Sequence, residues 1–227
     1  MRPVPYSALL TLLLVVSLVG CSASSVRLSF WRSDKDADVR GMRLNVLYAE
    51  HEDVAGLDLG LGLNKCWTMA GIQLTPFINV THSIRGIQIG GVANLPFSGW
   101  NYFGLPVPFN EVVGVQVSGL LNVATDFTGL ELSGLANLTD KGKGVQAAPV
   151  FNSATDMAGI QISLGYNWCA ASYSGDRMTG VQIGLINRAE YLRGVQIGLI
   201  NIVDHRSVPF IPFINVGFSR GKKRAGG

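Results

Sequence analysis

One short motif recurs along most of the chain, from residue 41 to residue 215. Its consensus is G-[VIL]-Q-[VIL]-x-[GP]-[LVF]-x-N, and the copies at 180–187 and 194–201 both read GVQIGLIN. Regular copies begin at Gly41, Gly56, Gly71, Gly86, Gly114, Gly129, Gly144, Gly159, Gly180 and Gly194, and a degenerate copy occupies 208–215. A unit this short cannot bury a hydrophobic face alone, so successive copies must stack on one another. The motif therefore predicts a single repeat domain over 41–218.

The alternation of residues within each copy predicts an all-β fold. Copies are fifteen residues apart in the first two blocks and fourteen apart in the third. Alternate positions of one copy form two sets, Val181, Ile183, Leu185 and Asn187 in the first and Gln182, Gly184 and Ile186 in the second. Period-two alternation is typical of β-strands, with one set on each face. The extra residue of the longer copies precedes a Gly or Pro and predicts a corner, where the prolines at 76, 149 and 212 need no ladder hydrogen bond.

Stacking these copies in register predicts a parallel β-solenoid, in which each coil lies ~4.8 Å from the last. Like residues would then form ladders along the axis. The asparagine ladder would contain positions 64, 79, 94, 122, 137, 152, 167, 187, 201 and 215, and stacked amides can hydrogen-bond to one another. Arg43 would meet Asp58 of the adjacent coil. The alternative is an antiparallel β-meander that closes into a barrel of about twelve strands, made from 26–31 and the repeats.

Two cysteines inside the repeats distinguish these architectures. Cys66 and Cys169 each follow the repeat asparagine by two residues, so they share a column that elsewhere holds alanine. In a solenoid they are six coils apart, roughly 29 Å at the usual strand spacing, far beyond the ~7 Å that a disulfide allows between Cα atoms. A closed barrel would let them meet. The solenoid therefore predicts two free, buried thiols.

The N-terminus has the features of a lipoprotein signal. A positive charge precedes an apolar run that is shorter than a typical transmembrane helix. The run ends in the letters LVGC, which resemble a bacterial lipobox whose cysteine is lipidated and becomes the new N-terminus. We therefore expect a signal peptide over 1–20, a lipid on Cys21, and a lipidated N-terminus with a capping strand over 21–40. Ser22 is not an aspartate, which by resemblance to lipoprotein sorting rules favours the outer membrane.

The charge distribution argues against a nucleic-acid partner. The net charge is +3, and five positive charges lie in the signal peptide and in the tail, 219–227. Without them the folded body carries a charge of about −2, so it offers no basic face to nucleic acid. The tail, SRGKKRAGG, is expected to be a basic, disordered and solvated end.

The sequence contains no constellation that predicts a catalytic or metal site. The three histidines, all between repeats at unrelated positions, are His51, His82 and His205. Such positions are usually solvated turns. The stretch DKDAD at 34–38 places carboxylates at alternate positions as calcium loops do, but Val39 and Asn45 replace the glycine and the glutamate that those loops require. We therefore expect a non-enzymatic protein without a metal or cofactor.

Two insertions interrupt the repeat and are the expected places for recognition. The first, 95–113, contains the aromatic residues Phe97, Trp100, Tyr102, Phe103 and Phe109. The second, 168–179, contains Trp168 and Tyr173 and leaves the repeat on the same side as the first. Clustered aromatic residues on loops suit a protein or glycan ligand. A flap that closes over exposed core is the other interpretation.

The GVQIGLIN units, the opening VRLSFW and the closing VPFIPFINVGF together resemble the bacterial surface-repeat lipoproteins that carry G-[VL]-Q-[IV]-G-L-x-N repeats, a family described mainly in spirochaetes. The resemblance covers roughly residues 26–218, and it assigns no activity. The long insertions and the basic tail after Phe218 depart from the family pattern. We therefore expect a lipid-anchored, non-enzymatic surface protein of the bacterial cell envelope with a structural or adhesive binding surface. The alternative is an outer-membrane-associated β-barrel with a structural or transport role.

Overall fold

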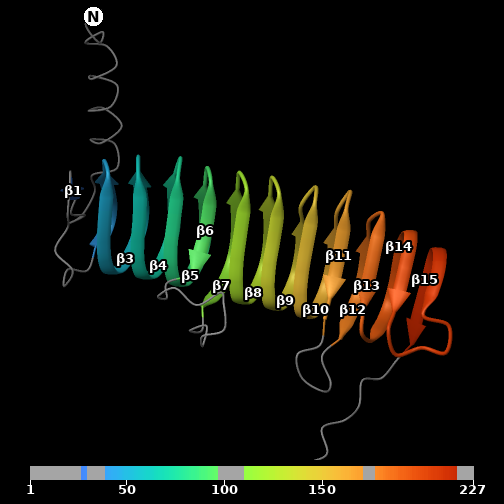
Figure 1. Cartoon of the computed structure of the whole chain (residues 1–227). Coiled ribbons are helices and arrows are strands. Elements are labelled where there is room, and N and C mark those ends of the chain that lie inside the picture. The colour runs from blue at the N-terminus through green and yellow to red at the C-terminus, as the bar shows by residue number, and fades with distance from the viewer. Residues whose placement is uncertain (1–26, 30–38, 97–109, 171–176, 219–227) are drawn as a thin grey trace, which may run out of the picture.

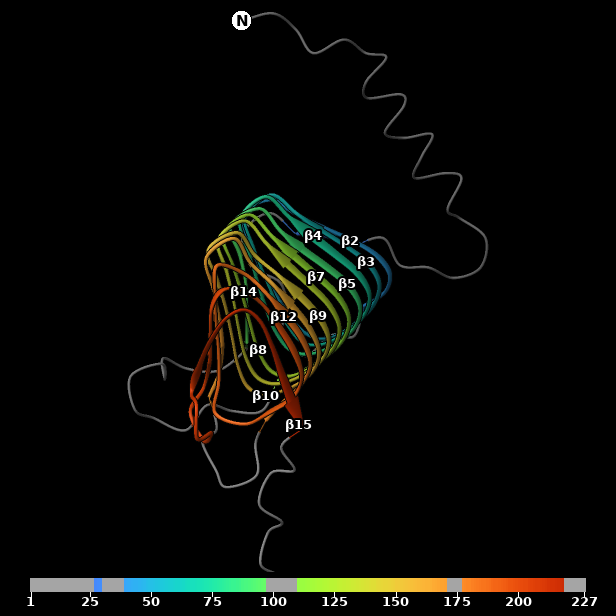
Figure 2. The same cartoon turned by 90° about the vertical axis from the view of Figure 1, so that its right-hand side faces the viewer.

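A computed structural model of the chain describes residues 27–29, 39–96, 110–170 and 177–218. Over these ranges the protein is all-β, and its strands wind into a β-solenoid of about 10 turns (Figure 1). Seen from the end, the coils superpose, so each lies on the one before it (Figure 2). The all-β solenoid predicted from the repeat is confirmed. Within the described ranges, no helix has the length and apolar character needed to cross a bilayer.

The strands form one continuous sheet. In chain order they are β1 Arg27–Ser29, β2 Val39–Asn45, β3 Tyr48–Gly60, β4 Leu63–Thr75, β5 Ile78–Gly90, β6 Ala93–Pro96, β7 Glu111–Ser118, β8 Leu121–Ser133, β9 Ala136–Ala147, β10 Phe151–Ile162, β11 Tyr166–Cys169, β12 Met178–Ile183, β13 Ile186–Ala189, β14 Leu192–Val203 and β15 Phe210–Phe218. A long strand such as β4 runs along one side of the coil and returns along the other. A two-residue bend then joins it to the next coil.

The pairings among β1 to β14 are all parallel, and those among β2 to β14 are in repeat register. Where β4 pairs with β5, Asn64 lies beside Asn79 and Gln73 lies beside Gln88. Backbone hydrogen bonds therefore run from coil to coil along the axis. The antiparallel meander that the sequence left open is not formed.

The glycine that opens each copy is required by the backbone. Gly144 has a φ of 135°, a value that residues with a Cβ rarely adopt. A Cβ at Gly144 would also lie 2.0 Å from the carbonyl oxygen of Gly129 in the preceding coil. The repeat glycine thus lets the strand bend while neighbouring coils remain in contact.

The degenerate last copy reverses the direction of the chain. β15 pairs with β14 in antiparallel orientation, so the expectation that 208–215 stacks as a further parallel copy is wrong. Val208 stands where the other copies have the glycine of positive φ, and a β-branched residue does not adopt that conformation. The reversal still preserves the inside of the coil, because Asn215 lies opposite Gln196 and its Nδ2 donates to the Gln196 Oε1 at 2.9 Å.

The interior of the coil has an apolar half and an amide half. The apolar half consists of two clusters, Val54, Cys66, Met69, Ile84, Val112, Ala124 and Phe127 in the first and Ala154, Met157, Cys169, Met178, Ala189, Leu192 and Val203 in the second. The amide half contains the repeat glutamines and asparagines, which are fully buried. Both described cysteines are buried and free, as the solenoid predicts.

Most of the buried amides are hydrogen-bonded in ladders that run along the axis. Asn79 Nδ2 donates to the Asn94 Oδ1 at 2.9 Å and to the carbonyl oxygen of Ile89 at 2.9 Å. The glutamine ladder runs the opposite way, because Gln88 Nε2 donates back to the Gln73 Oε1 at 2.8 Å. These bonds offset the cost of burying amides, which is high when they lack partners. The predicted asparagine ladder is confirmed from Asn79 to Asn201. Its predicted last member, Asn215, instead lies opposite Gln196.

The alternating set of residues that points into the coil changes at the bend. Gln182 and Asn187 are both buried although they belong to different alternating sets. Ile183 and Leu185, which lie between them, are 39% and 53% exposed. The division of a whole copy into two faces is therefore wrong, because the bend restarts the alternation between the glutamine and the asparagine.

Three charged residues replace amides in the glutamine column. Arg43 and Asp58 form the predicted pair between adjacent coils, with Arg43 Nε 2.6 Å from Asp58 Oδ1 and both side chains fully buried. The third is Glu131, which accepts hydrogen bonds from Gln146 Nε2 at 2.7 Å and from Thr139 Oγ1 at 2.8 Å. Burial raises the pKa of Glu131 to about 7, although these two hydrogen bonds oppose the change.

Candidate functional site

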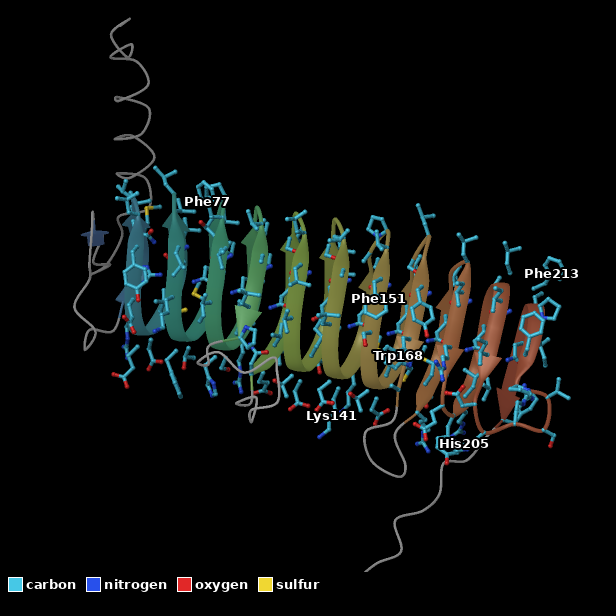
Figure 3. All side chains as sticks on the ribbon, in the orientation of Figure 1. Phe77, Lys141, Phe151, Trp168, His205 and Phe213 are labelled. Carbon is cyan, nitrogen blue, oxygen red and sulfur yellow. The ribbon has the colours of Figure 1, made fainter. Side chains whose placement is uncertain are left out.

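The outer surface of the solenoid is apolar along one edge. At the bend between copies, one apolar side chain in most coils points outward, and we call this column the apolar ridge. Its exposed members are Leu47, Phe77, Leu120, Leu135, Val150, Leu185, Leu199 and Phe213. Phe77 and Phe213 lie along the same edge of the stack (Figure 3). About 10 turns at ~4.8 Å per coil make the ridge roughly 45 Å long.

Both faces that meet at the ridge are also apolar on the outside. On one face Ile72, Ile160 and Ile162 are 37–41% exposed. On the other face Ile186 and Ile200 are 36% and 37% exposed. In the described part of the chain, the ridge and the outward column on each side of it contain no Asp, Glu, Lys or Arg. Amides thus fill half of the inside while aliphatic side chains cover this outside, which inverts the usual arrangement.

The opposite edge carries charged residues, and we call it the charged edge. There Glu111, Asp126, Lys141 and Asp156 follow one another in successive coils, so Lys141 lies between two aspartates. Lys141 points away from the edge that carries Phe77 (Figure 3). All four charged side chains line a groove of about 780 Å³. The outer surface is therefore segregated into one apolar and one charged edge.

The first insertion leaves the coil at the charged edge. It leaves after Pro96, and the coil resumes at Asn110, a residue that is 2% exposed. Asn110 Nδ2 donates to the carbonyl oxygen of Thr81 at 2.9 Å, and its Oδ1 accepts the backbone N–H of Thr125 at 3.2 Å. Asn110 thereby joins the coil before the interruption to the coil after it. The stack is continuous beneath the insertion.

The second insertion also leaves at the charged edge. β11 ends at Cys169 and β12 begins at Met178, with Arg177 in the column of Asp156. Both insertions are therefore shorter than the predicted ranges 95–113 and 168–179, because the residues at the ends of these ranges keep the repeat register. Their points of departure lie in neighbouring columns of one edge.

The aromatic residues proposed from the sequence as a binding surface are mostly outside the described residues. Those outside are Phe97, Trp100, Tyr102, Phe103, Phe109 and Tyr173, and the lipidation candidate Cys21 and the acidic stretch 34–38 are outside as well. Trp168 is described, and it belongs to β11 and not to the insertion. It is 36% exposed and stacks with Tyr166 at a centroid distance of 6.4 Å on the outer face (Figure 3).

The two histidines whose side chains the structure describes, His82 and His205, each stack on an aromatic ring. His82 stacks on Trp67, with ring centroids 4.2 Å apart. His205 stacks on Tyr191 at 4.5 Å, and its Nε2 lies 2.9 Å from Glu190 Oε1. Over the described ranges, no three His, Cys, Asp or Glu side chains come close enough together to hold a metal ion.

The buried thiol of the first apolar cluster is protected from reaction. Burial raises the pKa of Cys66 to about 12, and the negative charge of Asp58 acts in the same direction. The thiolate is the reactive form of cysteine, so Cys66 is inert at neutral pH. Its role is to fill the interior.

Comparison with known proteins identifies no relative: no family model, curated protein or solved structure matches the chain. The two edges of the solenoid are therefore the features that bear on function. The apolar ridge was not foreseen from the sequence, although its signal is present there. The residue two positions before each repeat asparagine is apolar in most copies and glycine in the others.

Proposed function

We propose that the chain is a lipid-anchored, non-enzymatic surface repeat protein of a bacterial cell envelope, held in the outer membrane, and that it presents a structural or adhesive binding surface to a protein or glycan. The observation that carries the proposal is the segregation of the outer surface. Both insertions depart from the charged edge, and the opposite edge is apolar. Such an arrangement suits a rod that faces a membrane on one side and a ligand on the other.

The proposed anchor is supported by the lipobox-like LVGC that ends at Cys21 and by the resemblance to surface-repeat lipoproteins. The acyl chains of a lipidated cysteine contribute ~0.8 kcal/mol for each buried methylene. Several chains together give a stable attachment.

The proposed binding surface is supported by the way the solenoid holds the insertions. Recognition residues commonly lie on loops that a rigid scaffold positions. Here the scaffold is bonded coil to coil on both sides of each interruption, as Asn110 illustrates between Thr81 and Thr125. Aromatic residues in such loops provide large contact areas for proteins and sugars.

The test replaces 97–109, and separately 171–176, with a short Gly/Ser turn in the full chain. Loops between repeats tolerate such changes, so β content measured by circular dichroism should persist. The probes are a glycan array and a panel of immobilised extracellular host proteins. We expect binding to fall at least about tenfold in one or both variants, because they lose the aromatic contacts.

A chain lacking only the tail, 219–227, is the control and should bind as the parent does. Unchanged binding in both loop variants would contradict the proposal. Loss of β content would instead support the flap interpretation of that insertion.

A further inference from the structure

We infer that the apolar ridge and the two faces beside it lie in the hydrocarbon boundary of a lipid bilayer, so that the solenoid rests lengthwise on the membrane with its charged edge turned away. This inference deepens the proposed function and rests on it for the membrane at which the chain is held. Three features of the described residues carry it: the convex shape of the apolar surface, the position of the charges, and the pairing of the backbone.

The shape of the apolar surface fits a fluid partner. The ridge is a corner, and exposed aliphatic side chains continue from Leu135 on the ridge to Ile160 on one face and Ile200 on the other. A rigid protein can cover one face or touch the corner along a line, and a line of contact buries far less than the ~1,600 Å² of a typical stable interface. Acyl chains can surround the corner and cover both faces at once.

The charges are placed as interfacial attachment requires, with an apolar side toward lipid and a polar side toward water. Leu135 and Lys141 belong to the same coil and lie at opposite edges. The first charges beyond the uncharged columns on one face are Glu50, Lys65 and Arg188. Glu50 and Lys65 form an ion pair at 2.9 Å, and Arg188 pairs with Asp204 at 3.2 Å. No described charge therefore has to enter hydrocarbon for the ridge to do so.

The backbone at the ridge can enter an apolar medium without loss of hydrogen bonds. In lipid, each backbone N–H and C=O must find its partner within the protein. The N–H of Leu135 donates to the carbonyl oxygen of Leu120 at 3.1 Å, and the N–H of Val150 donates to that of Leu135 at 3.2 Å. Apart from the Asn79 Oδ1 and the Gln116 Oε1, the ladder amides beneath from Asn79 to Asn201 are hydrogen-bonded from coil to coil, and the ridge side chains are hydrocarbon.

The C-terminal end of the ridge offers a place for a single acyl chain. An apolar groove of about 470 Å³ lies there, with Leu164, Leu185, Leu199 and Phe213 among its lining residues. At the other end of the stack, β1 begins six residues after Cys21, a reach of at most ~20 Å for an extended chain. A lipid on Cys21 would thus hold the first coils close to the bilayer, which raises the effective concentration of the ridge there.

The test introduces the photo-crosslinking residue p-benzoylphenylalanine at single positions of the full chain, in bacteria whose phospholipids carry ³²P. The test positions are Leu135 on the ridge and Ile160 and Ile200 on the two faces. Lys141, in the same coil as Leu135, is the matched control. All four side chains are exposed, so the replacements should leave the fold intact. We expect at least about tenfold more ³²P crosslinked at the three apolar positions than at Lys141, since only those positions contact acyl chains.

Equal phospholipid labelling at Leu135 and Lys141 would overturn the inference, and so would crosslinks from Leu135 to a second copy or to another protein in place of lipid. Incorporation of tritiated palmitate, and its loss in Cys21→Ser, is measured in the same cells. Palmitate label without phospholipid crosslinks refutes the membrane contact of the ridge and leaves the proposed anchor. Phospholipid crosslinks at Leu135 without palmitate label refute the anchor and leave the ridge contact.

Discussion

Glu131 stands in a column of glutamines, and when ionised it lacks the N–H that they donate to the preceding coil. Gln116 Oε1, which would receive that bond, has no partner among the described residues, and neither has Glu131 Oε1. A protonated carboxyl group supplies the missing donor, because its O–H can bond to the Gln116 oxygen. Burial raises the pKa of Glu131 to about 7, so the neutral form persists to higher pH than in an exposed glutamate.

Glu131→Gln should therefore remove a pH dependence of stability. The pKa rises from 4.5 to about 7 on folding, so the folded protein binds the proton more tightly and the free energy of unfolding falls as pH rises from about 4.5 to about 7. The fall should be about 3 kcal/mol, at ~1.4 kcal/mol per pKa unit. Urea unfolding at about pH 4.5 and pH 8 measures it in both chains. Glu111→Gln, on the charged edge, should keep the fall, and a fall of equal size in Glu131→Gln would show that Glu131 is not its source.

At the scale of the element, each coil changes direction at two places. One is the repeat glycine within the long strand, and the other is the two-residue bend that leads to the next coil. Gly144 and Gly142 lie two residues apart in β9 and differ in what surrounds them. A Cβ on Gly144 meets the backbone of Gly129, whereas a Cβ on Gly142 meets the sulfur of Met157, near the end of a flexible side chain. Only Gly144 has a positive φ. The repeat glycine and the neighbouring glycine therefore have different structural roles.

Gly144→Ala should destabilise the solenoid much more than Gly142→Ala does. The backbone conformation at Gly144 costs a residue with a Cβ about 1–3 kcal/mol, and the coil must also move away from Gly129. Met157 can instead change rotamer to admit a methyl group at Gly142. Thermal unfolding followed by circular dichroism compares the two variants. Similar melting temperatures would contradict the role assigned to the repeat glycine.

The stacked coils could be predicted from the sequence, whereas the set of side chains that points into each coil could not. Identical residues must meet when copies stack in register, which is why the asparagine ladder and the Arg43–Asp58 pair were predicted. Alternation does not say which set of residues is buried, and apolar residues are usually the buried ones. Here most amides find an identical amide in the next coil, so they can be buried at little cost. The reversal of β15 occurs in a copy that lacks both the repeat glycine and the repeat glutamine, with Val208 and Phe210 in their places.

At the scale of the whole molecule, the described solenoid is a rod roughly 45 Å long at ~4.8 Å per coil, with two unlike edges. A rod that lies along a membrane gains apolar contact at nearly every coil, whereas one that stands upright gains it only at its end. The lengthwise position also turns the charged edge, from which both insertions depart, toward the surroundings. The predicted binding residues Phe97, Trp100 and Tyr102 belong to the first of these insertions and stay a prediction.

Polarised infrared spectroscopy of the full chain in oriented bilayers tests this position most directly. The parallel pairings direct the backbone C=O bonds along the axis of the solenoid. If the ridge lies on the membrane, the axis lies in the membrane plane, and we expect the amide I band to absorb most strongly when light is polarised in that plane. An amide I dichroism along the membrane normal, or the absence of any dichroism, would contradict the lengthwise attachment of the ridge.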